Sequence, residues 1–130
     1  MIGVDATVLV RYLVRDDEEQ TARAKSVMEG FTVDEPGFIP MVVLLETAWL
    51  LRRTYKVPRE DVLATVEALV ASDLIHVQDE SVVAEALATA RMHGCDLPDA
   101  LLVAQARHAG CARTVTFDRR AVGLPGMEVV

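Results

Sequence analysis

The side chains of this sequence that are best suited to chemistry are four carboxylates spread along the chain. Carboxylates packed at close range repel one another, and a divalent cation relieves that repulsion. Oxygen ligands without a placed histidine or cysteine favour Mg²⁺ or Mn²⁺ over Zn²⁺. Such a site suits phosphodiester hydrolysis, because the metal orients and deprotonates a water and offsets charge on the attacked phosphate. The four residues are Asp5, Glu46, Asp99 and Asp118.

Glu46 carries the strongest argument from the sequence alone. It is the only charge in the stretch 41–51, which is apolar nearly all round and therefore predicts a buried helix. Burying a lone ionised carboxylate is costly unless a partner, a metal or a proton compensates it. The sequence leaves two explanations open, an ion pair with an arginine and a metal-binding or catalytic role.

Each of the three aspartates also has a purely structural explanation. Asp5 could cap the helix predicted after it, and Asp118 could form a cap or turn before two arginines. Asp99 lies three residues after Asp96, a spacing that fits an N-cap followed by an acid that stabilises the first turn. Independent caps have no reason to converge with Glu46 on one edge of a sheet, so we expect one acidic cluster.

Short apolar segments alternate with helical segments along the whole chain. This alternation predicts an α/β domain of three layers, with a mostly parallel sheet flanked by helices and residues 1–130 forming a single domain. Ligands of such sheets bind beyond the carboxyl ends of the strands, where we place Asp5 and Asp118. The predicted strands are 1–4, 38–40, 74–77, 114–117 and 127–130, and the predicted helices cover about 8–13, 16–29, 41–55, 59–71, 81–93 and 96–109.

The composition narrows the class of protein. Hydrophobic residues make up 52% of the chain, but charges break every apolar run before it reaches the length of a membrane span. We expect a cytoplasmic protein, because the first residues lack the pattern of a secretory signal, and we expect Cys95 and Cys111 to be reduced. The net charge of −7 argues at first against a nucleic-acid ligand, although a local basic patch or bound cations can reverse the field at a site.

Four segments of the sequence resemble the PIN-domain family, and within it the VapC-type toxins of bacterial toxin–antitoxin pairs. The resemblance extends over nearly the whole chain, and the segments occur in the family's order and spacing. They are 2–13 (Ile-Gly-Val-Asp-Ala-Thr-Val-Leu-Val-Arg-Tyr-Leu), 44–47 (Leu-Leu-Glu-Thr), 94–101 (Gly-Cys-Asp-Leu-Pro-Asp-Ala-Leu) and 114–120 (Thr-Val-Thr-Phe-Asp-Arg-Arg).

The resemblance implies a PIN fold and an Mg²⁺- or Mn²⁺-dependent endoribonuclease that cleaves an RNA substrate. It also implies a homodimer that is neutralised by a cognate VapB-type antitoxin. By motif position, Asp5, Glu46, Asp99 and Asp118 look like the metal-binding and catalytic acids, with Asp96 as a helper. No serine, cysteine or histidine is placed as a nucleophile, so we expect attack by a metal-activated water and no covalent intermediate.

One position departs from the family pattern. Family members often carry Asn two residues after the first Asp, where this chain has Thr7. A threonine hydroxyl could hold a metal-bound water instead, and Thr116 could do the same on a later strand. Positive charge for RNA could come from seven side chains, namely Arg11, Arg15, Arg52, Arg53, Lys56, Arg119 and Arg120.

Two other functions remain open. The chain could be a catalytically silent PIN-like module that binds RNA or protein, if the change at Thr7 or an unfilled metal site has removed activity. A phosphoacceptor signalling domain fits less well, because such domains carry adjacent acids after the first strand and a lysine late in the chain. Here Asp5 stands alone and the only lysines are Lys25 and Lys56.

Overall fold

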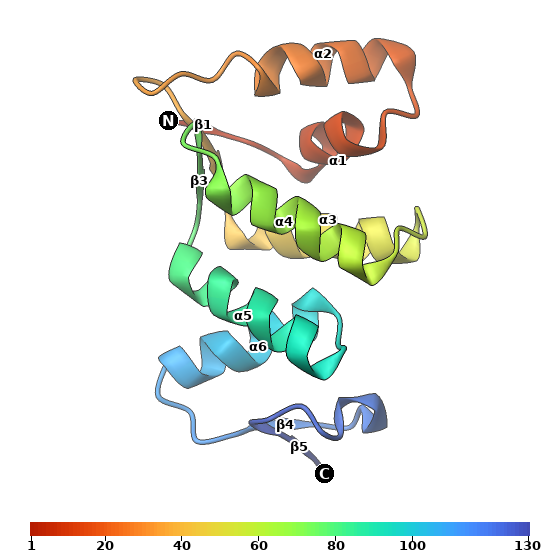
Figure 1. The fold of residues 1–130 in the computed structure, drawn as a ribbon, viewed down its shortest axis with the longest axis vertical. Helices are drawn as coiled ribbons and strands as arrows, with labels where there is room; N and C mark the ends of the chain where they lie inside the picture. Colours follow the sequence, from red (N-terminus) through yellow and green to blue (C-terminus); the bar gives the residue numbers. More distant parts are fainter. The chain divides into compact units, whose positions relative to one another are not determined.

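The computed structural model describes all 130 residues and separates them into two compact units, Met1–Gln78 and Asp79–Val130 (Figure 1). Six α-helices accompany five short strands, and every strand pairing is parallel. The predicted α/β class, with parallel strands flanked by helices, is therefore confirmed. The strands lie in two sheets, one of three strands and one of two. No helix is long and apolar enough to cross a membrane.

The first unit is a three-stranded sheet with two helices in each connection. The sheet order is β1-β2-β3, so strands that follow one another along the chain are neighbours in space. Parallel neighbours need such crossovers, because a tight turn can join only antiparallel strands. Its elements are β1 (Ile2–Gly3), α1 (Ala6–Val14), α2 (Glu18–Met28), β2 (Gly37–Ile39), α3 (Met41–Arg53), α4 (Arg59–Ala71) and β3 (Ile75–Val77).

Local sequence signals explain several of these boundaries. The Asp17 side chain accepts a hydrogen bond of 2.8 Å from the backbone N–H of Gln20, which makes the acidic run before α2 a helix cap, as predicted. Pro40 ends β2 and takes the N-cap position of α3. Gly37 in β2 must lack a side chain, because a Cβ there would lie 2.5 Å from the ring of Phe31.

The core of the first unit is aliphatic. Side chains from α1, β2, α3 and α4 are completely or almost completely buried in it. This burial is the main force that holds short strands and helices together, because none of these elements is long enough to be stable in isolation. The largest of its fully buried side chains are Leu9, Ile39, Leu44, Leu63 and Val66.

The second unit is a helix pair followed by a two-stranded parallel sheet. The predicted apolar face of α5 is confirmed, because Val83, Ala86 and Ala90 are completely buried and α5 packs against α6. Gly94 ends α5 in the left-handed conformation (φ 64°), which a glycine adopts without strain. The elements are α5 (Glu80–His93), α6 (Leu97–His108), β4 (Thr114–Thr116), a 3₁₀ turn η1 (Arg119–Ala121) and β5 (Met127–Val129).

Candidate metal centre

Asp5 lies where the sequence placed it, just beyond the carboxyl end of β1. Strand β1 ends at Gly3, and Asp5 is the second residue after it. The residue between them, Val4, still donates its backbone N–H to the carbonyl of Phe38 in β2. It holds the N-cap position of α1, yet its carboxylate makes no capping hydrogen bond. Instead, Thr7 Oγ1 donates a hydrogen bond of 2.9 Å to Asp5 Oδ2. The capping explanation therefore does not account for this exposed carboxylate.

The predicted burial of Glu46 is wrong, because its side chain is exposed. The buried face of α3 carries residues such as Leu44, Ala48 and Leu51, whereas Val42 (69% exposed) and Trp49 (53% exposed) lie on the side of Glu46. The helix is apolar on both faces but buried on only one, which the sequence pattern did not reveal. Glu46 also makes no hydrogen bond or ion pair, so the arginine partner considered from the sequence is absent.

Asp96 and Asp99 lie at the start of α6 in the second unit. Asp96 holds the N-cap position, but its side chain makes no capping hydrogen bond. Asp99 lies in the first turn, where the helix dipole favours a negative charge. Partial loss of solvation raises the pKa of Asp99, and the nearby carboxylates of Asp118 and Asp96 raise it further. The structure therefore brings these three acids within electrostatic reach of one another.

Asp118 follows β4 and is held from two sides. The hydroxyl of Thr116 accepts a hydrogen bond of 3.0 Å from the backbone N–H of Asp118. The Asp118 carboxylate caps the 3₁₀ turn η1 and forms an ion pair with Arg120, whose Nε and Nη2 atoms each donate at 3.0 Å. These bonds with Arg120 lower the pKa of Asp118. The capping explanation is thus confirmed for Asp118, and the cation that it binds in the structure belongs to the chain itself.

The donor chemistry of these residues fits a hard divalent cation. The acidic residues offer oxygen ligands only, and the raised pKa of Asp99 reflects partial burial together with nearby negative charge, both of which a bound cation would offset. Nowhere do three or more His, Cys, Asp or Glu side chains form a ready-made metal cage. Mg²⁺ does not require one, because it commonly binds one or two carboxylates, several waters and substrate phosphates. The assignment of the four acids to one metal site stays a prediction.

Several of the basic side chains that the sequence suggested for RNA binding form hydrogen bonds or ion pairs within the chain. Arg11 bonds to Asp16 at 2.8 Å and to Gln20, and Arg52 donates to the carbonyl of Val57. Arg15 lies over the ring of Tyr12, 5.3 Å from its centre, and ends α1 in the left-handed conformation. With Arg120 paired as well, the cations of this set that make no hydrogen bond, ion pair or ring contact with their side chains are Arg53, Lys56 and Arg119.

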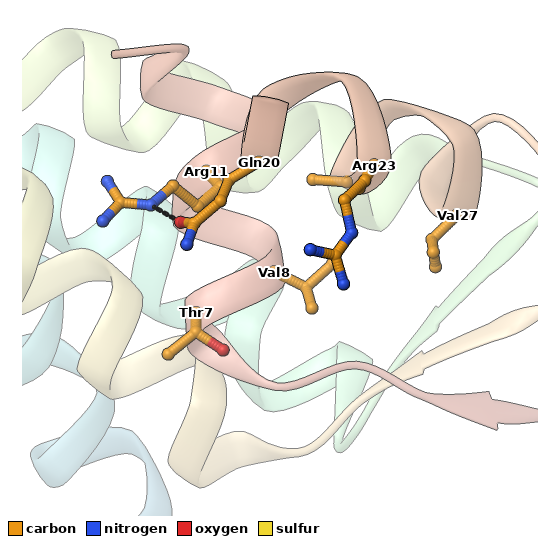
Figure 2. Close-up of a pocket in the computed structure, with 7 residues that line it drawn as sticks. Thr7, Val8, Arg11, Gln20, Arg23 and Val27 are labelled. Atoms are coloured by element: carbon orange, nitrogen blue, oxygen red, sulfur yellow. Dashed lines mark hydrogen bonds between the residues drawn. The ribbon is translucent and has the colours of Figure 1, made fainter. Parts of the chain in front are cut away.

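A pocket of about 320 Å³ opens between α1 and α2, beginning at the residue that holds Asp5 (Figure 2). Its walls are mainly apolar, and the guanidinium group of Arg23 supplies positive charge, whereas that of Arg11 is paired with Asp16. Arg23 projects from α2 toward Val8 of α1, and Val27 lies further along α2 (Figure 2). No motif in the sequence predicted this pocket, because it depends on how two helices pack. The lining residues are Thr7, Val8, Arg11, Gln20, Arg23, Ala24 and Val27.

Comparisons with known proteins identify the family to which this chain belongs. The family model of the PIN domain matches residues 2–125, and the chain therefore belongs to the PIN-domain family. It is 27% identical to a protein named VapC ribonuclease from Aquifex aeolicus (strain VF5), over 117 residues that cover 90% of this chain and 87% of the relative. A solved structure described as a toxin-antitoxin complex from Klebsiella pneumoniae covers 98% of this chain and 96% of its own, with 20% identity and a TM-score of 0.38.

Proposed function

We propose that this protein is a metal-dependent endoribonuclease of the VapC type. The observation that carries the proposal is the group formed by Asp96 and Asp99 at the start of α6 and Asp118 after β4, in which partial burial first, and then the charges of Asp118 and Asp96, raise the pKa of Asp99. A partly buried acid beside two like charges has no evident structural benefit, and a bound Mg²⁺ or Mn²⁺ ion would supply the missing compensation. The match to the PIN-domain model and the similarity to a VapC ribonuclease support the same reaction.

The chain's own residues would divide the work as follows. Asp99 and Asp118 would hold the metal, Asp96 would add negative charge beside them, and Asp5 and Glu46 would serve the same reaction. The metal, when bound, would orient and deprotonate the attacking water and offset charge on the phosphate. Thr7 would keep the Asp5 carboxylate in one rotamer through the hydrogen bond between them. The match over residues 2–125 supports treating residues 1–130 as one PIN domain in this role.

A cognate antitoxin of the VapB type is the proposed protein partner. The pocket between α1 and α2 has apolar walls and the guanidinium group of Arg23, which suits an apolar side chain beside an acidic residue. It also begins at Thr7, two residues from a carboxylate of the proposed site. A partner seated in this pocket would therefore lie next to the acid that it has to silence.

Self-association is proposed for the exposed face of α3. Val42 and Trp49 flank Glu46 there, and both expose more than half of their surface. An exposed tryptophan on an apolar helix face is typical of a surface that a partner covers, because aromatic side chains are enriched in interfaces. A second copy of this chain is the occupant that the resemblance implies.

One observation favours a second function, a silent PIN-like binding module. Three ligating side chains do not converge at any one place, and Glu46 is exposed rather than held in a buried site. Calorimetric titration with Mn²⁺ separates the two functions. The ribonuclease requires Mn²⁺ binding that Asp99→Asn weakens at least tenfold, whereas a silent module requires no binding that depends on the acids.

The direct test is cleavage of structured and unstructured RNAs by the purified protein with Mn²⁺ or Mg²⁺. We expect endonucleolytic products from the wild type, no products after chelation with EDTA, and a loss of at least a hundredfold in Asp99→Asn. Asp73→Asn is the matched control, because Asp73 is exposed and lies outside the acidic residues of the site. Equal cleavage by the wild type and Asp99→Asn would exclude the proposed site.

A further inference from the structure

The carboxylate of Asp118 is engaged by Arg120 on both of its oxygens. Arg120 Nε donates to Asp118 Oδ1 and Arg120 Nη2 donates to Oδ2, each at 3.0 Å, and the backbone N–H of Arg120 donates to Oδ1 at 2.9 Å. This parallel two-bond geometry is the strong form of an arginine–carboxylate pair. A divalent cation that takes an oxygen of Asp118 must therefore share the carboxylate with Arg120 or displace it.

The influence of Arg120 extends to the other acids of the second unit. Its positive charge opposes the rise in the pKa of Asp99. In turn, the carboxylates of Asp118, Asp99 and Asp96 all raise the pKa of Arg120, Asp118 most strongly. Arg120 thus lies within electrostatic reach of all three acids, while its hydrogen bonds go to Asp118.

The pair is built so that it can open. The side chain of Arg120 is 80% exposed and that of Asp118 is 37% exposed, so water can solvate the guanidinium once it leaves the carboxylate. Ion pairs at such exposure are weak and screened by salt. A divalent cation carries twice the charge of a guanidinium and can approach the carboxylate more closely, so it competes effectively.

We propose that Arg120 is a built-in counter-ion that competes with the divalent metal for Asp118 and thereby sets the metal affinity of the acidic group. Without metal, the two hydrogen bonds from the guanidinium neutralise Asp118 and limit repulsion among the acids. When the metal binds, the ion pair opens and Arg120 moves into solvent. The proposal rests on the proposed function, because it takes Asp118 to be a metal ligand.

The test is calorimetric titration of the full chain with Mn²⁺, in the wild type and in Arg120→Gln. Removing the competitor should tighten Mn²⁺ binding about two- to fivefold, the range set by the strength of an exposed ion pair. Arg119→Gln is the matched control, because it makes the same charge change at an adjacent exposed residue that forms no ion pair. We expect it to change the affinity less than about 1.5-fold. Arg120→Lys keeps the charge but loses the paired hydrogen bonds, so its affinity for Mn²⁺ should lie between the affinities of the wild type and Arg120→Gln.

A second measurement reports the opening of the pair directly. Arginine Nε–H signals of ¹⁵N-labelled protein can be followed during titration with diamagnetic Mg²⁺, and the Arg120 signal is assigned by its absence in Arg120→Gln. We expect this signal to move toward the position of a solvated arginine as Mg²⁺ binds, while the Arg119 signal stays in place. A role for Arg120 that is only structural would leave its signal unchanged.

The outcomes separate this proposal from the proposed function. Equal or weaker Mn²⁺ binding by Arg120→Gln, with binding by the wild type intact, overturns the counter-ion role and leaves the ribonuclease standing. Mn²⁺ binding by Arg120→Gln where the wild type binds too weakly to measure supports the counter-ion role. Absence of binding in both proteins overturns both proposals.

Discussion

Thr7 Oγ1 donates a hydrogen bond of 2.9 Å to Asp5 Oδ2, across the boundary between β1 and α1. From the sequence we expect the Thr7 hydroxyl to hold a metal-bound water. In the structure the hydroxyl instead holds the carboxylate, in a position where family members often carry an amide. An amide N–H₂ group can donate a hydrogen bond in the same way as the threonine hydroxyl.

The first prediction follows from this hydrogen bond. Thr7→Val removes the donor while keeping the shape of the side chain, so the Asp5 carboxylate loses its fixed rotamer. We expect RNA cleavage to fall about tenfold or more, the usual cost of losing a group that orients a metal-site acid. Thr7→Asn is the control that restores a donor, and it should keep cleavage within a few-fold of the wild type. Full activity in Thr7→Val would show that the bond has no functional role.

The second prediction concerns stability and pH. The pKa of Asp99 is raised above its ordinary value of 3.8, so the native state keeps this proton to higher pH than the unfolded chain does. Stability therefore falls as the pH rises from 3.8 through the raised pKa, and at neutral pH Asp99 destabilises the metal-free protein. Asp99→Asn should be more stable than the wild type at pH 7, by up to about 0.5 kcal/mol after allowance for solvent screening. This gain should disappear well below pH 3.8.

Chemical denaturation in EDTA across the pH range measures this difference, with Asp73→Asn as the control for net charge. Saturating Mn²⁺ should reverse the order, because only the wild type retains the ligand and is stabilised by binding. If Asp99→Asn is the less stable protein at pH 7 without metal, then the ionised Asp99 is not destabilised in the native state by burial and by the charges of Asp118 and Asp96.

The sequence predicted the elements better than it predicted the site. Alternating apolar segments located every strand and helix to within a few residues, because strand ends and helix caps such as Asp17 and Gly94 are local chemistry. The burial predicted for Glu46 is wrong because the apolar residues Val42 and Trp49 share its exposed face. Hydrophobic periodicity does not distinguish a buried face from an uncovered one.

Arg120 shows the other limit of a prediction from sequence. The Asp-Arg-Arg segment was interpreted as an acid followed by cations for RNA, and the two arginines were indistinguishable there. The 3₁₀ turn after Asp118 directs the second arginine back onto the carboxylate, with both the backbone and the side chain donating. The Asp-X-Arg spacing before a turn is a sequence signal for this ion pair. Only the backbone geometry shows that the second arginine, and not the first, forms it.

The third prediction tests the pocket between α1 and α2 as the antitoxin site. Arg23→Glu reverses a charge on the pocket wall and should weaken binding of the cognate antitoxin about tenfold or more, measured by calorimetry. Lys25→Glu is the matched control, because Lys25 is exposed on the same helix but does not line the pocket. Equal losses in the two variants would mean that overall charge, and not this pocket, governs the interaction.

The fourth prediction tests the exposed face of α3. Trp49 is the only tryptophan of the chain, so its fluorescence reports on this face without labelling. If a second copy covers it, the emission should shift to longer wavelength on dilution, and Trp49→Ala should weaken the dimer at least tenfold in analytical ultracentrifugation. Met92→Ala, which removes another exposed apolar side chain, should leave the dimer intact. A monomeric wild type at high concentration would contradict the assignment.

The central claim is that carboxylates far apart in the sequence serve one metal-dependent reaction on RNA. Single-turnover RNA cleavage with Mn²⁺, compared among the wild type, Asp5→Asn, Asp99→Asn and the double variant, tests it most directly. Residues that act as a unit are strongly non-additive, so we predict that each single variant loses at least a hundredfold and that the double variant is scarcely worse than either. Cleavage at the wild-type rate by both single variants would contradict the claim. So would small losses of rate in Asp5→Asn and Asp99→Asn whose product equals the loss in the double variant.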